Sequence, residues 1–200
     1  MNDRTFQADR ARVLDDPQRR IWLPPDEVLS TIGLRPGAVV ADIGAGTGYF
    51  ALPFAEAVGP AGKVFAVDFQ PAMLEIIAEK LSTNVRLTNV DIRSGSAAST
   101  MLDRMSVDVV FMANLWHELD EVSSVLAEAK RVLRKDGRLF IVDWRADVPS
   151  PPGPPAHHRV ALRVVTETLG AEGWHVIASG HIGSYSHFID AEPAKERKSL

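Results

Sequence analysis

Residues 39–50 read VVADIGAGTGYF, and this stretch decides the fold. Val39–Ile43 is a short apolar run that is typical of a buried strand. Phe50, Phe54 and Val58 then recur at the spacing of one helix face. The glycines between them lie where the strand turns into a helix, and glycine leaves no Cβ between the main chain and a ligand. The pattern predicts a ligand-binding turn, and a glycine-rich turn without a ligand is the alternative.

Strand and helix patterns continue to alternate along the chain. Further strands are expected at 63–68, 85–90, 107–112 and 138–144, and helices at 26–33, 71–81, 122–133 and 156–170. The proline-rich segment 149–155 is expected to be a loop. Alternating strands and helices imply a mostly parallel sheet that is covered on both faces. Residues 175–181 and 184–189 are separated by too few residues for a parallel crossover, so we expect an antiparallel hairpin there.

The composition is that of an ordinary globular domain. The 200 residues carry a formal net charge of -4, which gives no electrostatic reason to expect a nucleic-acid partner. The absence of cysteine excludes disulfides and thiolate metal sites. The charged N-terminus does not resemble a signal peptide, and no apolar run approaches the roughly 20 residues that span a bilayer. We therefore expect a cytoplasmic protein without a membrane span, and the sequence does not indicate its oligomeric state.

The spacing of the glycines distinguishes between two kinds of cofactor. In the dinucleotide fingerprint G-x-G-x-x-G, a third glycine would fall at position 49, which is Tyr49. Asp42, just before the turn, would repel a pyrophosphate but suits a ligand that carries an ammonium group. Asp68 ends the second strand, where its carboxylate oxygens would accept the hydroxyl protons of a ribose. Its alternative role is to cap the helix that begins near Pro71.

These features together resemble the class I S-adenosylmethionine-dependent methyltransferases of the small-molecule type (methyltransferase domains 11, 25 and 31). Residues 42–48 are similar to motif I of that family. The similarity continues through residues 67–68, 108–110 and 131–139 to the terminal hairpin, and it covers residues 30–190. The resemblance implies a Rossmann-like, doubly wound α/β fold. Its mostly parallel seven-stranded sheet would carry helices on both faces and end in an antiparallel strand.

The same resemblance divides the chain into an N-terminal extension (1–29), the methyltransferase domain (30–190) and a C-terminal tail (191–200). Related enzymes often use such an extension as a lid over the cofactor, and residues 19–22 are the candidates here. A solvated arm packed by Ile21 and Trp22 is the alternative. The proline-rich loop is a candidate wall of the acceptor pocket. Arg159 after it either faces an anionic group or belongs to a charged helix face.

The resemblance also implies which residues bind S-adenosylmethionine. Asp68 would hold the ribose hydroxyls, and Phe69 would pack on the adenine. Ser96 stands where the family often has an acidic residue that bonds the adenine amine, and Asp91 is the alternative acid. Asn114, after the fourth expected strand, would also contact the cofactor. The turn residues that would lie against the methionine part are Gly44, Ala45, Gly46 and Gly48, with Asp42 beside them.

His117 is the candidate catalytic residue. It lies in Asn114–Leu119, at the sheet edge where such folds bind ligands. Amino-group methylases of nucleic acids usually have Asn/Asp-Pro-Pro-aromatic here, and Asn-Leu-Trp-His argues against that chemistry. His117 would act as a general base, because a neutral imidazole titrates near the working pH. Alternatively, His117 and Trp116 only shape the pocket wall. The expected reaction is methyl transfer to an O, N or C atom of a small-molecule acceptor.

The sequence carries no metal-binding motif, and two functions other than methyl transfer remain alternatives. No HExxH motif or carboxylate cluster with ligand spacing appears, so we predict no metal. His157 and His158 are adjacent and would point in different directions on a helix, and His175, His181 and His187 are expected at the surface. Arsenic methylation would need cysteines that the chain lacks. A nucleotide-dependent oxidoreductase, disfavoured by the glycine spacing, and a non-catalytic S-adenosylmethionine-binding module remain the alternatives.

Overall fold

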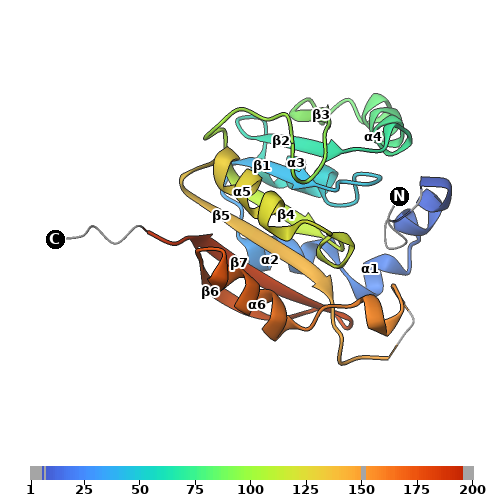
Figure 1. The fold of residues 1–200 in the computed structure, drawn as a ribbon. Coiled ribbons are helices and arrows are strands. Elements are labelled where there is room, and N and C mark those ends of the chain that lie inside the picture. Colours follow the sequence, from blue (N-terminus) through green and yellow to red (C-terminus); the bar gives the residue numbers. More distant parts are fainter. Residues whose placement is uncertain (1–5, 7, 150–151, 196–200) are drawn as a thin grey trace.

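A seven-stranded sheet forms the centre of the computed structural model, which describes residue 6, residues 8–149 and residues 152–195 (Figure 1). The strand order is β3-β2-β1-β4-β5-β7-β6. The strands are β1 (Val39–Ile43), β2 (Lys63–Asp68), β3 (Val90–Ser94), β4 (Val107–Ala113), β5 (Leu133–Trp144), β6 (Trp174–Ile182) and β7 (Ser186–Pro193). Strands β1 to β5 pair in parallel, and β7 runs antiparallel to both β5 and β6. The predicted fold class and the terminal hairpin are confirmed.

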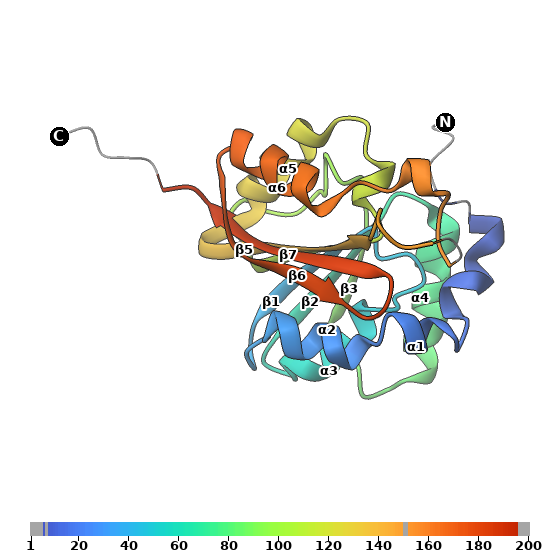
Figure 2. The ribbon, with the colours of Figure 1, turned by 90° about the horizontal axis from the view of Figure 1, so that it is seen from below.

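Helices cover both faces of this sheet (Figure 2). Helices α2 (Pro25–Ile32), α3 (Ala51–Val58) and α4 (Pro71–Thr83) pack on one face, and α5 (Val122–Val132) and α6 (Leu162–Ala171) pack on the other. The short helices are η1 (Ala8–Asp15), α1 (Arg19–Trp22), η2 (Trp116–Glu118) and η3 (Ala156–His158). Within the described residues, no helix is both long and apolar enough to cross a membrane.

The predicted third strand was wrong. It was expected at 85–90, but Val85 is 83% exposed and β3 begins only at Val90. In the strand itself Val90 and Ile92 pack on the core, while the charged residues Asp91 and Arg93 alternate with them. Residues 85–89 therefore precede the strand. Because β3 is an edge strand, its apolar residues alternate with charged ones and do not form the continuous apolar run that the prediction relied on.

Two other predicted boundaries also shift. Helix α5 ends at Val132 and β5 begins at Leu133, so the residues before Arg138 belong to the strand. The helix expected at 156–170 is split into η3 and α6, because the backbone is extended at Arg159 and at Ala161. Strand β7 continues past residue 190 to Pro193. Of the proline-rich segment 149–155, residues 150 and 151 lie outside the described residues, and the rest is a loop.

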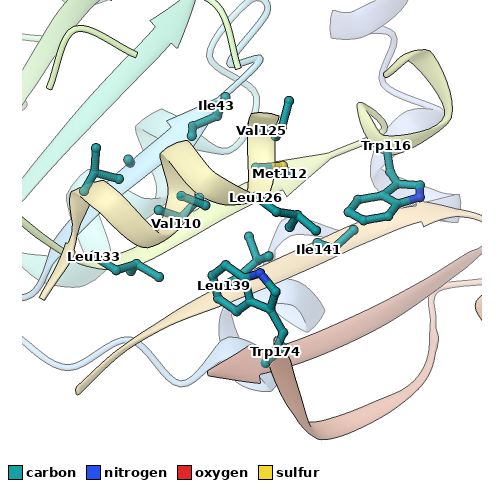
Figure 3. Packing of buried hydrophobic residues seen from close by; sticks show 14 of the residues in the cluster. Ile43, Val110, Met112, Trp116, Val125, Leu126, Leu133, Leu139, Ile141 and Trp174 are labelled. Atoms are coloured by element: carbon teal, nitrogen blue, oxygen red, sulfur yellow. The ribbon is translucent and has the colours of Figure 1, made fainter. Parts of the chain in front are cut away.

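Two apolar clusters hold the helices against the sheet. Figure 3 shows the cluster on the face of the sheet that α5 and α6 cover, in which Leu126 of α5 points toward the sheet and Trp116 lies at the end of the cluster nearest the loops. On the opposite face, the Phe111 ring on β4 meets the Phe54 ring edge-on at 4.7 Å and stacks with the Phe140 ring at 6.2 Å. Phe111 therefore joins α3 to the two central strands that end at the candidate site.

The Phe111→Ala variant is expected to lose about 3–5 kcal/mol of unfolding free energy, because it removes a fully buried ring at the centre of this cluster. Urea unfolding followed by circular dichroism measures the loss. The Val85→Ala variant is the control, and its unfolding free energy should stay within about 0.5 kcal/mol of the wild type. Equal unfolding midpoints for the two variants would contradict the central role of Phe111.

Candidate functional site

A cavity of about 1090 Å³ lies at the carboxyl ends of β1, β2, β4 and β5. Ligands of open α/β sheets bind at this edge. The volume lies just above the range of about 300–1,000 Å³ that is usual for pockets that hold one drug-sized ligand. A smaller cavity of about 430 Å³ lies at the amino-terminal edge of the sheet, where Arg134 and Asp108 form an ion pair at 2.9 Å. The larger cavity is therefore the candidate site.

The glycine turn forms one wall of the large cavity. Gly44, Gly46 and Gly48 have φ values of 71°, 54° and 81°, which are in the left-handed region that favours glycine. The amides of Gly44 and Ala45 both donate to the Val67 carbonyl, at 2.8 and 3.0 Å. A Cβ added at Gly46 would meet a Leu14 methyl group at 3.2 Å. The left-handed backbone therefore favours glycine at these three positions, and a side chain at Gly46 would also have to displace Leu14.

Asp42 lies beside the turn and is only 2% exposed. Burial and, to a lesser extent, the charge of Asp68 raise the pKa of its carboxyl, Arg19 opposes them, and the resulting pKa is about 7. Its Oδ2 atom has no hydrogen-bond partner among the described residues. A buried carboxylate oxygen without a partner is costly, and a cationic donor in the cavity would remove that cost. The site thus fits the predicted ligand with an ammonium group.

Asp68, at the end of β2, joins the turn to the next helix. Its Oδ2 accepts a hydrogen bond from the Gly46 amide at 2.9 Å, and its Oδ1 accepts one from the Gln70 amide at 2.9 Å. Burial raises the pKa of Asp68, and these amides act in the opposite direction. The bond to Gln70 closes a turn directly before α4, but Gln70 is the N-cap residue and no side chain caps the helix, so the alternative role of Asp68 as a helix cap was wrong. Each carboxylate oxygen keeps a lone pair for a ligand hydroxyl.

The other predicted cofactor residues also line the cavity. Phe69 is half exposed, and Ser96 lies in a turn closed by its amide and the Ser99 carbonyl. Asn114 has a left-handed φ of 53°, and its amide oxygen is buried without a partner among the described residues. Such strain in a residue other than glycine is usual at ligand sites. Asp91, the alternative acid, is not in the cavity wall, because its carboxylate binds Lys63 and Arg93, both at 2.8 Å.

His117 faces the cavity from η2 and is held by Asp143 at the end of β5. The His117 Nδ1 and Asp143 Oδ1 atoms are 2.8 Å apart, and the His117 amide donates to Asp143 Oδ2 at 3.1 Å. Burial lowers the pKa of His117, but the charge and hydrogen bond of Asp143 outweigh it, so the pKa lies above the usual 6.5. With Nδ1 donating to the carboxylate, Nε2 is left as the proton acceptor. Glu118 Oε1 is 3.9 Å from that Nε2.

The sequence analysis did not identify Asp143, although its position at the end of a predicted strand pointed to it. Asp143 lies at the carboxyl end of its strand, as Asp42 and Asp68 do. The same rule that selected those acids would have selected this one. Its pairing with His117 depends on β4 and β5 lying side by side, with Met112 opposite Ile141 and Ala113 opposite Val142.

The N-terminal segment lies against the glycine turn. Asp15 accepts a hydrogen bond from the Thr47 hydroxyl at 2.8 Å and from Lys80 at 2.7 Å. The Trp22 ring packs on the Trp144 ring at 4.9 Å, and both rings line the cavity. Ile21 is 78% exposed, so the predicted packing by Ile21 was wrong. Residues 1–5 and 7 of the predicted extension lie outside the described residues.

Two predictions about charged side chains were wrong. Arg159 does not line the cavity: its buried guanidinium donates to four backbone carbonyls and so shapes the proline-rich loop. The carbonyls belong to Arg145, Val148, Pro152 and Pro154. His187 is buried rather than at the surface, because β7 lies inside the sheet. No group of three or more metal-binding side chains occurs within the described part of the chain.

Comparisons with known proteins agree with this geometry. A family model described as a methyltransferase domain matches residues 41–141. The demethylmenaquinone methyltransferase of Lactococcus lactis subsp. lactis is 29% identical over 131 residues, 66% of this chain and 51% of that protein. The ubiquinone/menaquinone biosynthesis C-methyltransferase of Ectopseudomonas mendocina is 33% identical over 147 residues, 72% of this chain and 53% of that protein. The chain spans about half the length of these curated relatives.

A solved structure is similar over nearly its whole length. The crystal structure of a SAM-dependent methyltransferase from Aquifex aeolicus superposes with a TM-score of 0.88 and 32% sequence identity. The match covers 94% of this chain and 98% of that one. The similarity therefore includes the terminal hairpin as well as the glycine turn.

The Asp143→Asn variant is expected to lower the pKa of His117 from above 6.5 to below it, because burial remains while the carboxylate charge is lost. An NMR titration of the His117 ring protons measures the change. The Asp147→Asn variant is the control, since Asp147 is exposed and pairs with Arg145. An unchanged His117 pKa in Asp143→Asn would show that the two side chains do not interact in solution.

Proposed function

This chain belongs to the class I S-adenosylmethionine-dependent methyltransferases, and we propose that it methylates a ring carbon of a small aromatic acceptor of the reduced-quinone class. The observation that carries the proposal is that the glycine turn and the His117–Asp143 pair line one cavity. That cavity has room for a second ligand beside the cofactor. Family membership, together with Tyr49 at the third glycine position, favours methyl transfer over the oxidoreductase alternative.

The residues around the turn suit S-adenosylmethionine group by group. Asp42, with its unpartnered oxygen, is assigned to the ammonium group. Asp68 keeps lone pairs for the ribose hydroxyls, and the half-exposed Phe69 offers a ring face to the adenine. Asn114 and Ser96 border the same space. The turn residues assigned to the methionine part are Gly44, Ala45, Gly46 and Gly48.

The part of the cavity near His117 suits a flat apolar acceptor. Trp22 and Trp144 supply aromatic surface, and Leu115, Val125 and Pro154 supply apolar surface. The acidic residues Glu118, Asp120 and Glu121 also line the cavity. Aromatic and apolar side chains with few polar groups are typical of sites for such ligands. The two curated relatives act, by their names, on demethylmenaquinone and in ubiquinone and menaquinone biosynthesis. Both observations support a quinone-derived ring over a polar acceptor.

His117 is assigned the role of general base. S-adenosylmethionine supplies a methyl group that its positive sulfur already activates. A ring carbon is a weak nucleophile until a neighbouring hydroxyl group loses its proton. His117 Nε2 accepts that proton, and Asp143 stabilises the imidazolium that results. Electron density from the oxyanion then increases at the adjacent ring carbon, which takes the methyl group as its bond to sulfur breaks and S-adenosylhomocysteine leaves. Loss of the proton on that carbon to solvent, and return of the proton from His117 to the oxygen, restore the aromatic ring. His117 thus activates the acceptor, and the remaining contribution is alignment of the two ligands.

Incubation with S-adenosylmethionine and demethylmenaquinol tests the proposal. Mass spectrometry and NMR of the product are expected to show a new methyl group on a ring carbon. A methyl ether would contradict carbon methylation and indicate an O-methyltransferase. Cofactor binding without any product from a panel of quinols, phenols and amines would favour the non-catalytic module.

Affinity for S-adenosylmethionine is expected to fall as pH decreases below about 7, because the carboxyl of Asp42 then protonates and no longer attracts the ammonium group. Above pH 7 the carboxylate is already charged, so the affinity should level off. Calorimetry from pH 5.5 to 8 measures this dependence, and the Asp42→Asn variant should lose it. His117→Ala and Glu118→Gln, the controls for two other groups of the cavity wall whose pKa values are raised, should keep it. An identical pH dependence in wild type and Asp42→Asn would refute the assignment.

The His117→Ala variant is expected to slow methyl transfer by about 10²–10⁴-fold, as is usual when a positioned base is lost. Affinity for the cofactor should change little. In the wild type the rate should fall at acid pH as His117 protonates, and Asp143→Asn should move that limb to lower pH. Initial rates from pH 5 to 8 provide the measurement. If His117→Ala instead raises mainly the acceptor KM, then His117 only shapes the pocket.

A further inference from the structure

Arg19 is a buried cation that lines the candidate site. It is the first residue of α1, it is 5% exposed, and it belongs to the cavity wall. Its Nη1 atom donates to the Leu14 carbonyl at 2.9 Å, and its guanidinium carbon lies 4.0 Å from the centre of the Tyr49 ring. Its Nε atom has no hydrogen-bond partner among the described residues. A buried guanidinium with an unmet donor is costly unless an anion accepts from it.

The protein itself does not supply that anion. Asp42 and Asp15 act on Arg19 through their charges, but no ion pair joins Arg19 to a carboxylate within the described residues. Asp15 is engaged instead with Lys80 and Thr47. Tyr49 donates its hydroxyl proton to the Leu23 carbonyl at 2.8 Å, so its ring is held in place beneath the guanidinium. The Tyr49 ring and the Leu14 carbonyl thus hold the guanidinium in place, while its Nε–H group stays without an acceptor among the described residues.

Arg19 and Asp42 present complementary unmet groups to the same cavity. Arg19 has a buried N–H without an acceptor, and Asp42 has a buried oxygen without a donor. An amino-acid end, with its carboxylate and ammonium on one carbon, satisfies both. Arginine suits the carboxylate because its planar guanidinium stays charged and directs several N–H groups to one side.

We propose that Arg19 binds the carboxylate of the methionine end of S-adenosylmethionine, opposite Asp42. The inference rests on the proposed assignment of the cofactor to this cavity. It makes the N-terminal segment part of the binding site, since α1 supplies a direct ligand contact. It also makes the site selective for a cofactor that keeps its carboxylate.

Decarboxylated S-adenosylmethionine is the probe, because it lacks only that carboxylate. Calorimetry with both compounds is carried out on the wild type, Arg19→Met and Arg19→Lys. The wild type is expected to prefer S-adenosylmethionine by about 10- to 100-fold, the range for hydrogen bonds between charged groups. Arg19→Met should lower that preference at least about tenfold, chiefly by weakening S-adenosylmethionine binding. Arg19→Lys keeps the charge without the planar group and should give an intermediate preference.

Arg20→Met is the matched control. Arg20 is the neighbouring residue on α1, but it is exposed and outside the cavity wall. The Arg20→Met variant should therefore prefer S-adenosylmethionine over the decarboxylated compound as strongly as the wild type does. Thermal unfolding of each variant shows whether it is folded. If Arg19→Met does not fold, Arg19→Lys carries the comparison.

Other outcomes separate the possible failures. If both compounds lose affinity in parallel in the Arg19 variants, Arg19 only packs the segment and the proposal is overturned. An unchanged preference overturns it as well, while the assignment of the cofactor stands. If the wild type binds neither compound, the proposed function and this inference fail together.

Discussion

The carboxylate of Asp68 is the interaction on which the site depends. One oxygen accepts from Gly46 in the turn after β1, and the other accepts from Gln70 at the start of α4. These bonds hold two neighbouring strand ends in one arrangement, although the residues are far apart in the chain. Without these bonds, the Gly46 amide in the turn would lose its acceptor. The left-handed backbone of the turn would also lose a hydrogen bond that stabilises it. The position of this cavity wall therefore depends on the Asp68 side chain.

Three aspartates are buried at the carboxyl ends of β1, β2 and β5, and each is compensated in a different way. Asp68 is compensated by backbone amides, and Asp143 by the ring and the amide of His117. Asp42 keeps an oxygen without a partner, and its pKa is raised to about 7. Hydrogen bonds from the protein hold Asp68 and Asp143 in position, whereas Asp42 keeps an oxygen that a ligand would pair. Burial alone does not show this difference, since all three acids are buried.

The N-terminal segment connects the two halves of the cavity. Leu14 and Asp15 contact the glycine turn, while Trp22 packs on Trp144 near His117. Helix α1 is anchored by the hairpin turn, where the Ser184 amide donates to the Trp22 carbonyl at 3.3 Å. A segment that resembles a charged arm in the sequence thus contributes side chains to two parts of the cavity wall.

The sequence by itself determined the α/β class, the glycine turn, the acids at the ends of β1 and β2, and the hairpin. These features follow from local periodicity and glycine spacing, which depend only on neighbours in the chain. The start of β3 was not determined this way, because an edge strand with alternating charges lacks a strong apolar signal. Tertiary structure alone decided that Asp143 holds His117, that Arg19 lines the same cavity as Asp42, and that the Arg159 guanidinium binds the loop carbonyls. These pairings join residues from different elements, and their partners are chosen by strand register and by the burial of charge rather than by spacing along the chain.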